Sequence, residues 1–216
     1  AQSPWSGEWT PQAELQGTAQ GNWPPTPAVI NNSLRFRSSA NAYLNRTPAV
    51  NGSATTYTIS MWVKRGLVAT GTYYDLFSAG PLGGSDEGLF FDSATGGLVY
   101  YFTNSTVTFL TTAVYRDPSA WYHIVVSIDT TQAVAANRAK LYVNGTQVTS
   151  FSTTNYPAQN ATATYINQAQ IQRIGFHTSA AYPFDGYMAD INFIDGQALT
   201  PSSFGQYNGD TGVWSA

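Results

Sequence analysis

The sequence predicts an all-β protein in which two antiparallel sheets pack face to face. Three observations support this fold class. Strand signals recur roughly every 8–15 residues, with Asn, Gly and Pro between them. Polar and apolar residues alternate along the two clearest strands, 57–63 and 187–194, as expected where one face of a strand is buried. The one stretch with helical character, residues 129–138, is too short to pack as an independent helix.

Composition indicates one large domain and excludes several classes of protein. A chain of 216 residues is long enough for a single β-sandwich with a large core. Only 10% of residues are charged, the net charge is −3, and the nine Lys and Arg are scattered, so the chain lacks the basic surface that nucleic-acid binding requires. No stretch approaches the ~18 apolar residues of a membrane span. We therefore expect no nucleic-acid partner and no membrane insertion.

The absence of cysteine excludes a disulfide framework and a thiolate metal site. A secreted eukaryotic sandwich often carries a disulfide. The lack of one favours a protein that is assembled in a reducing cytoplasm and used outside the cell.

Residues 1–27 differ from the rest of the chain and are predicted to form an extended arm, followed by a sandwich over residues 28–216. The arm holds five of the eleven Pro, which fix φ and remove ladder donors, and the three residues Trp5, Trp9 and Trp23. Free Trp side chains are costly to leave in water. One hypothesis is that the arm docks on a neighbouring subunit or a larger assembly. The other is that it folds back over its own sandwich.

The first half of the sandwich is predicted from short runs of alternating or apolar residues. These strands cover residues 33–36, 42–44, 57–63 and 75–78, followed by a probable hairpin of 88–92 with 98–102. In the third strand Tyr57, Ile59, Met61 and Val63 should face the core. Trp62 would then point outward, as would Trp121 further along the chain.

The second half begins with the most hydrophobic strand, 121–128, in which Tyr122, Ile124, Val126 and Ile128 should face the core. A strand at 140–143 ends in Asn144-Gly145, the commonest tight hairpin dipeptide, and returns through 147–148. Another strand begins at 170–175. The closing strand, 187–194, should place Tyr187, Ala189, Ile191 and Phe193 on one face and Met188, Asp190, Asn192 and Ile194 on the other.

Four stretches together resemble the laminin-G-like, concanavalin A-like lectin/glucanase domains. They are YTISMWVKRG, WYHIVVSID, KLYVNGTQV and FDGYMADINFIDGQALT, and the resemblance covers about residues 28–204. It implies a jelly roll of two curved antiparallel sheets. The closing FIDGQALTPSSFG and the following TGVWSA are most similar to versions of the domain in fibre and decoration proteins of tailed bacteriophages. That similarity implies a location on the virion surface, outside the cell.

The resemblance also implies a binding site at loops on one rim, often with calcium, which takes about six to eight oxygen ligands. Many relatives carry an acidic pair where this chain has Ala189 and Asp190, so Asp185 and Asp190 are the remaining metal candidates. The alternative is a strand Asp bonded to a backbone amide or to solvent.

Catalytic patterns are missing. Glycosidases need two carboxyl groups close together, and this chain has only Glu8, Glu14 and Glu87, with no Glu-x-Asp-x-x-Glu-like run. Neither His123 nor His177 lies in a nucleophile-elbow context, and His123 is more typical of a half-buried structural residue. We therefore predict no enzymatic activity.

Recognition is the remaining function, because aromatic faces stack on sugar rings while amides and carboxylates bond the hydroxyls. The candidate glycan-binding residues are Tyr73, Tyr74, Asp75, His177 and Tyr182. Together with the resemblance to phage fibre and decoration proteins, this implies a non-enzymatic structural protein of the virion surface. It would dock through residues 1–27 on other virion proteins or on copies of itself, with cell-surface glycans as candidate ligands. A secreted stand-alone lectin is the alternative, and a glycoside hydrolase is a weaker third hypothesis.

Overall fold

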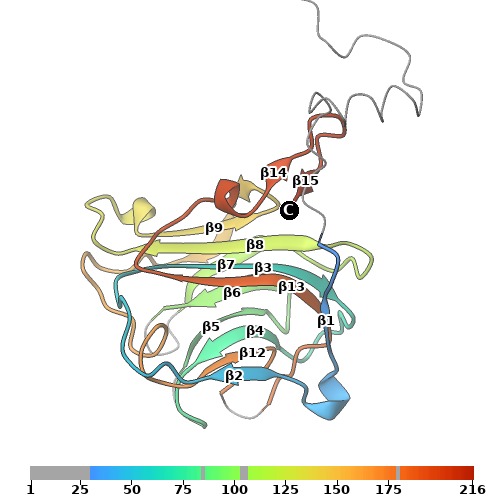
Figure 1. Cartoon of the computed structure of the whole chain (residues 1–216), viewed down its shortest axis with the longest axis horizontal. Coiled ribbons are helices and arrows are strands. Elements are labelled where there is room, and N and C mark those ends of the chain that lie inside the picture. The colour runs from blue at the N-terminus through green and yellow to red at the C-terminus, as the bar shows by residue number, and fades with distance from the viewer. Residues whose placement is uncertain (1–29, 84–85, 103–106, 179–180) are drawn as a thin grey trace, which may run out of the picture.

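The computed structural model confirms the predicted fold class, with two antiparallel sheets packed face to face (Figure 1). The structure describes residues 30–83, 86–102, 107–178 and 181–216. The six-stranded sheet has the order β1 (Leu34–Phe36), β13 (Gly186–Asp195), β3 (Thr56–Arg65), β8 (Tyr122–Asp129), β9 (Ala139–Val143) and β10 (Thr146–Gln147). The seven-stranded sheet has the order β11 (Phe151–Thr154), β7 (Val107–Val114), β6 (Gly97–Tyr101), β5 (Glu87–Phe91), β4 (Tyr74–Ala79), β12 (Gln172–Ile174) and β2 (Leu44–Arg46).

Smaller elements join and cover these sheets. The last strands, β14 (Gln206–Tyr207) and β15 (Trp214–Ser215), form a separate two-stranded ribbon. Three single 3₁₀ turns are η1 (Ser38–Ala40), η2 (Ala135–Asn137) and η3 (Pro201–Ser203). The helical turn expected within residues 129–138 is therefore η2. Over the described ranges, no helix is long and apolar enough to cross a membrane.

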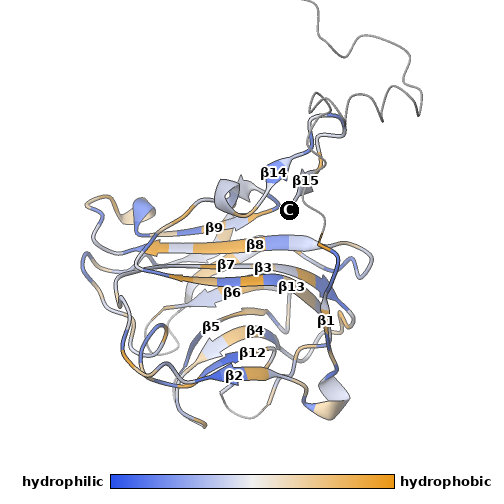
Figure 2. Ribbon diagram, in the orientation of Figure 1, coloured by the Kyte–Doolittle hydropathy of each residue, from blue (hydrophilic) through white to orange (hydrophobic). Residues whose placement is uncertain are grey.

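The core lies between the sheets and is built by the period-2 patterns. Tyr57, Ile59, Met61 and Val63 of β3 are buried as predicted, and β3 pairs with β8 in the register Ile59↔Val126. Figure 2 shows hydrophobic residues concentrated along β8 and alternating with hydrophilic ones along β13. Such alternation gives each strand one face for the core and one for solvent or a covering segment.

Two polar contacts hold this core together from inside. The hydroxyls of Tyr57 and Tyr100 lie 2.7 Å apart and bond one sheet to the other. The buried Glu87 carboxylate accepts hydrogen bonds from three successive backbone amides, Thr164, Tyr165 and Ile166, at 2.7–3.0 Å. Glu87 therefore fixes the long segment between β11 and β12 to the end of β5.

The predicted faces of the closing strand are wrong over half of its length. In β13, Met188 is buried in the core, whereas Tyr187 is exposed. The pairing with β3 shifts between Ala189 and Asn192, where Asp190 takes a positive φ of 46°. This β-bulge inserts one extra residue, so Ile191 and Phe193 return to the same side as Met188. Strict alternation cannot reveal such an insertion.

Other expectations divide into confirmed, missed and untested. The hairpin of β5 with β6 and the Asn144-Gly145 turn between β9 and β10 are both present. The sequence patterns did not identify β7 or β11, which pair with each other. Trp5, Trp9 and Trp23 lie outside the described residues, so the arm and the boundary at residue 28 stay predictions.

Candidate ligand-binding sites

Four of the five predicted glycan-binding residues meet at one place. Tyr73 precedes β4, Asp75 lies on β4, and His177 and Tyr182 belong to the loop between β12 and β13. The ring centroids of Tyr73 and Tyr182 are 5.1 Å apart, edge to face, and those of His177 and Tyr182 are 5.5 Å apart. The Asp75 amide donates to the Tyr182 carbonyl at 3.3 Å. Asp86, just before β5, lies 2.8 Å from His177 Nε2 through its Oδ2. We call these five residues the aromatic–acidic cluster.

The fifth predicted residue, Tyr74, is not part of the cluster. Side chains alternate between the two faces of β4, so Tyr74 points away from its neighbours Tyr73 and Asp75. Its side chain is buried in the core, with the Arg65 guanidinium 5.2 Å from the ring centre. Tyr74 therefore contributes to packing.

Two further rings extend the cluster across the outer face of the seven-stranded sheet. Phe90 contacts Tyr73 edge to face at 5.4 Å and Tyr101 at 4.8 Å. Tyr73, Tyr101, His177 and Tyr182 are half-buried, so each ring keeps part of its surface open. The alternation of β5 could have identified Phe90, because the buried Leu89 and Phe91 on either side of it face the core.

The electrostatics of the cluster are those of a buried acid pair. Asp75 is fully buried, and within the described part of the chain neither carboxylate oxygen has a hydrogen-bond partner. Burial raises the pKa of Asp75 well above its usual value, and the nearby Asp86 raises it further. The pKa of Tyr101 is raised as well, mainly by burial, with smaller contributions from Tyr73 and the acids. A buried carboxyl group without donors costs free energy, and such groups concentrate at functional sites.

The backbone beside this acid pair is strained. Tyr182 has a φ of 58°, in the left-handed region that bulky side chains rarely adopt. Conformations of this kind persist where the surroundings impose them, and they are enriched at binding sites. The strain holds the Tyr182 ring between Tyr73 and His177.

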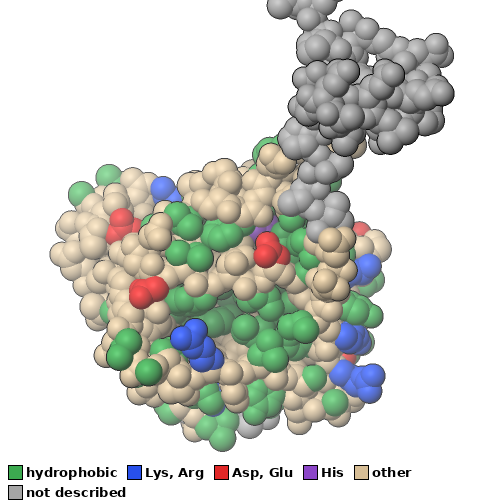
Figure 3. Space-filling model, viewed as in Figure 1, with side chains coloured by type: hydrophobic (Ala, Val, Ile, Leu, Met, Phe, Trp, Pro, Cys, Tyr) green, Lys and Arg blue, Asp and Glu red, His purple; other side chains and the backbone are tan. Residues whose placement is uncertain are grey.

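A second candidate site is a cleft of about 680 Å³ between the edges of the two sheets, which we call the inter-sheet cleft. Its apolar lining comes from Ile59, Phe77, Ile174, Ile191 and Phe193, and its polar rim includes Asn45, Arg46, Asn51, Asn192 and Asp195. Figure 3 shows hydrophobic side chains lining a hollow in the middle of this face, with charged side chains near its margin. The sequence patterns did not predict this cleft, because it depends on how far the sheet edges stand apart.

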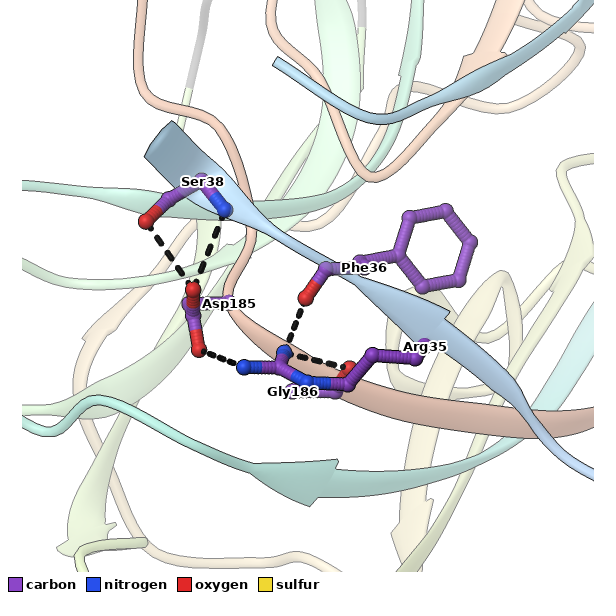
Figure 4. A network of polar contacts seen from close by, with 5 residues as sticks. All are labelled: Arg35, Phe36, Ser38, Asp185 and Gly186. Carbon is purple, nitrogen blue, oxygen red and sulfur yellow. Dashed lines mark hydrogen bonds and ion pairs between the residues drawn. The ribbon is translucent and has the colours of Figure 1, made fainter. Parts of the chain in front are cut away.

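The two predicted metal ligands are not arranged around a common point. The Asp185 carboxylate accepts bonds from the Arg35 guanidinium at 2.8 Å and from the Ser38 amide and hydroxyl, both at 3.0 Å (Figure 4). Arg35 also donates to the carbonyls of Phe36 and Gly186. Burial acts to raise the pKa of Asp185, but the bonds from Ser38 and Arg35 outweigh it and lower the pKa.

Asp190 lies apart from this network, exposed at the β-bulge. In the described ranges no group of three or more His, Asp or Glu side chains is placed to hold a metal ion. The contacts of Asp185 support the alternative that this carboxylate is bonded within the protein. Calcium binding by the pair stays a prediction without structural support.

Trp62 points away from the core, as predicted, and the outer face of the six-stranded sheet is covered at this residue. The Trp62 ring stacks on His123 at 4.9 Å, and the Trp214 ring of β15 lies nearly parallel to His123 with its centroid 5.7 Å away. Trp62 is 8% exposed, and Trp121 is half-buried. An open depression of about 810 Å³ beside this ribbon is lined by residues that include Tyr142, Tyr207 and Trp214.

His123 bonds a serine but does not form a catalytic triad. Its Nε2 lies 2.9 Å from Ser60 Oγ, and both side chains are fully buried. In a triad a carboxylate accepts a hydrogen bond from the second ring nitrogen. Here the Trp214 indole donates to that nitrogen instead, and burial lowers the pKa of His123 to about 4. The arrangement fits the structural role predicted for His123.

Two solved structures share the two-sheet architecture of this chain. Domain 4 of the extracellular arabinanase AbnA from Geobacillus stearothermophilus superposes with a TM-score of 0.52 and 18% identity, over 85% of this chain and 88% of that one. An SAP-like pentraxin from Limulus polyphemus superposes with a TM-score of 0.50 and 14% identity, over 82% of this chain and 76% of that one. These identities show a shared fold alone. No sequence match to a curated protein was found.

The family match covers most of the sandwich. Residues 37–203 match the laminin-G-type family described as the concanavalin A-like lectin/glucanases superfamily. This range includes every strand of the two large sheets except β1, and with them the aromatic–acidic cluster and the inter-sheet cleft. The chain therefore belongs to the concanavalin A-like lectin/glucanase superfamily.

Proposed function

We propose that this protein is a non-enzymatic glycan-binding module whose site is the aromatic–acidic cluster. One observation carries the proposal: half-open aromatic rings surround a buried acid pair in which the Asp75 oxygens lack donors. Aromatic faces pack against the apolar side of a sugar ring, and its hydroxyls donate to carboxylates and accept from His and Tyr. The half-buried rings of the cluster offer the aromatic contact and the His and Tyr donors at the surface, while Asp75 and Asp86 are 0% and 4% exposed.

The fold supports the same proposal at a coarser level. The superposed arabinanase domain was solved in complex with arabinotriose, so a sandwich of this architecture can hold an oligosaccharide in that protein. At 18% identity nothing about the sugar transfers to this chain. Hydrolysis is not proposed, because the one buried Glu of the described sandwich, Glu87, is bonded to three backbone amides.

We also propose that the module is displayed on a virion surface, docked through residues 1–27 on other virion proteins or on copies of itself. The resemblance of the closing segment to phage fibre and decoration proteins supports this role, as does the concentration of Trp and Pro in the arm. The alternative is a secreted lectin that works alone. Immunogold labelling of virions and of the culture fluid, with an antibody against the sandwich, separates the two.

Glycan binding is tested with the full chain on a glycan array, followed by calorimetric titration of the best sugar. Tyr73→Ala should weaken binding at least tenfold, because Tyr73 contacts both Phe90 and Tyr182. Tyr207→Ala, which changes an exposed Tyr outside the cluster, is the matched control and should bind normally. Melting curves verify that both variants fold. Absence of binding to every glycan, or equal loss in both variants, would rule out this site.

A further inference from the structure

The inter-sheet cleft lies beside a sheet edge that lacks a strand. β1 pairs with β13 only at residues 186–188. Beyond the bulge, residues 192–195 of β13 pair with β3 on one side, and among the described residues no strand pairs with them on the other. On the other side of the cleft, β2 is the edge strand of the seven-stranded sheet. Unpaired edges of this kind accept an added strand, which here would lie over the mouth of the cleft.

Several apolar side chains that line the cleft are exposed to solvent. Leu44 is 46% exposed, Val50 75% and Phe193 36%, and all three line it. Phe193 stacks on the buried rings of Tyr57 and Phe77, with centroids 5.8 Å apart, and is the open ring of this stack. A strand with one apolar face would pair with the free edge of β13 and cover these exposed apolar side chains.

The N-terminal arm contains such a strand pattern. From residue 5 to residue 20, apolar residues, glycine or proline occupy every odd position and polar residues every even one. The odd positions are Trp5, Gly7, Trp9, Pro11, Ala13, Leu15, Gly17 and Ala19, and the even positions are Ser6, Glu8, Thr10, Gln12, Glu14, Gln16, Thr18 and Gln20. This period of 2 is that of a half-buried strand. A single Pro is compatible with an edge strand, where its missing N–H can face away from the ladder.

The length of the linker allows residues 5–20 to reach the inter-sheet cleft. Residues 20–33 separate this pattern from β1 and can span up to about 45 Å, whereas the distance along β13 from Met188 to Phe193 is about 17 Å. A linker longer than the gap it bridges raises the local concentration of the tethered segment to roughly the millimolar range. Residues 5–20 carry Glu8 and Glu14 and no Lys or Arg, and the rim of the cleft carries one charge of each sign, Arg46 and Asp195, so charge does not select the occupant.

We propose that residues 5–19 of the chain add to the free edge of β13 in the same molecule, with their odd-numbered side chains in the inter-sheet cleft. The segment supplies the missing edge strand and covers Phe193 and Val50. A partner that takes up the arm must then displace it from the cleft. This inference does not depend on glycan binding.

The absence of native cysteine allows a direct test in the full chain. Val50→Cys is combined in turn with a cysteine at each position from 12 to 18, and disulfide formation is followed under mild oxidation by non-reducing electrophoresis. Val134→Cys replaces Val50→Cys in the control series, because Val134 is 60% exposed but does not line the cleft. Hydrogen exchange of the 192–195 amides is compared between the parent chain and Leu15→Asp.

The proposal expects the strongest crosslink within the monomer at one odd position among 13, 15 and 17, because a disulfide needs Cα atoms within about 7 Å and a docked strand has one register. It expects at least fivefold weaker crosslinks at the neighbouring even positions, and few with Val134→Cys. It also expects faster exchange of the β13 amides in Leu15→Asp. Crosslinks of equal yield at odd and even positions, or equal yield with Val134→Cys, would show an undocked arm. Crosslinks only between molecules would show that a second copy supplies the strand. Either result, or no crosslink at any position, overturns the proposal.

Discussion

The indole Nε1–H of Trp214 donates a hydrogen bond to Nδ1 of His123 at 2.9 Å. Because Nδ1 accepts this bond, the proton of the neutral imidazole is on Nε2, which donates to Ser60 Oγ. The His123 ring also stacks on Trp62, with centroids 4.9 Å apart. One buried, uncharged histidine therefore connects the C-terminal ribbon to the outer face of the six-stranded sheet.

Acid should weaken this connection. The pKa of His123 is about 4 in the folded chain because of burial, against an ordinary value of 6.5 when unfolded. Between these values the unfolded state binds a proton that the folded state does not. Stability should therefore fall as the pH falls from about 6.5, by roughly 2–3 kcal/mol at pH 4.5 from this group alone. Above pH 6.5 the contribution is independent of pH.

Urea unfolding at several pH values measures this effect. His123→Phe keeps an aromatic ring at this position and removes the titrating group. The difference in the free energy of unfolding between wild type and variant should therefore change by roughly 2–3 kcal/mol between pH 7 and pH 4.5. A His123→Phe variant that loses stability with acid as steeply as the wild type would show that other groups cause the loss.

Asp75 should have the opposite pH dependence. Its pKa is raised in the folded state by burial and by Asp86, so the folded chain retains a proton that the unfolded chain releases as the pH rises above its ordinary value of 3.8. Wild-type stability should therefore decrease with rising pH through this group. Asp75→Asn should be more stable than the wild type at pH 7, and the gain should shrink toward pH 4. If Asp75 contacts a sugar, the same variant should bind glycans more weakly, which is the usual conflict between stability and function.

Glu87 should be among the most sensitive positions in the sandwich. Its carboxylate is fully buried and satisfies the backbone N–H groups of Thr164, Tyr165 and Ile166. Glu87→Ala would leave three donors without a partner and should cost about 3–5 kcal/mol in the free energy of unfolding. Glu87→Gln keeps one acceptor oxygen and should cost about half as much, as measured by chemical denaturation. Equal, small losses for both variants would mean that water replaces the carboxylate without difficulty.

The fold class could be predicted from local sequence patterns because the core strands show regular alternation of inward and outward residues. The inward residues of β3 and β8 follow from alternation alone, and the Asn144-Gly145 dipeptide identifies the turn between β9 and β10. Residues near the predicted glycan site could be identified because Tyr73, Asp75, His177 and Tyr182 lie in or beside loops. Alternation failed at β13, where Asp190 adds a residue. It placed Trp62 outward correctly, but it could not reveal that a segment about 150 residues later covers this side chain. Contacts at such separations, like that of Asp185 with Arg35, depend on the assembled sheets.

The hydroxyl pair of Tyr57 and Tyr100 allows a test of how buried polar groups contribute to this core. Both side chains are fully buried, and the two hydroxyls bond only each other among the described groups. Tyr57→Phe or Tyr100→Phe alone leaves one hydroxyl buried without a partner and should cost about 1–3 kcal/mol. The double variant removes both polar groups together. Its free energy of unfolding should be no lower than that of the less stable single variant. A double-mutant cycle by urea denaturation measures this coupling, and strictly additive losses would show that each hydroxyl finds another partner, such as buried water.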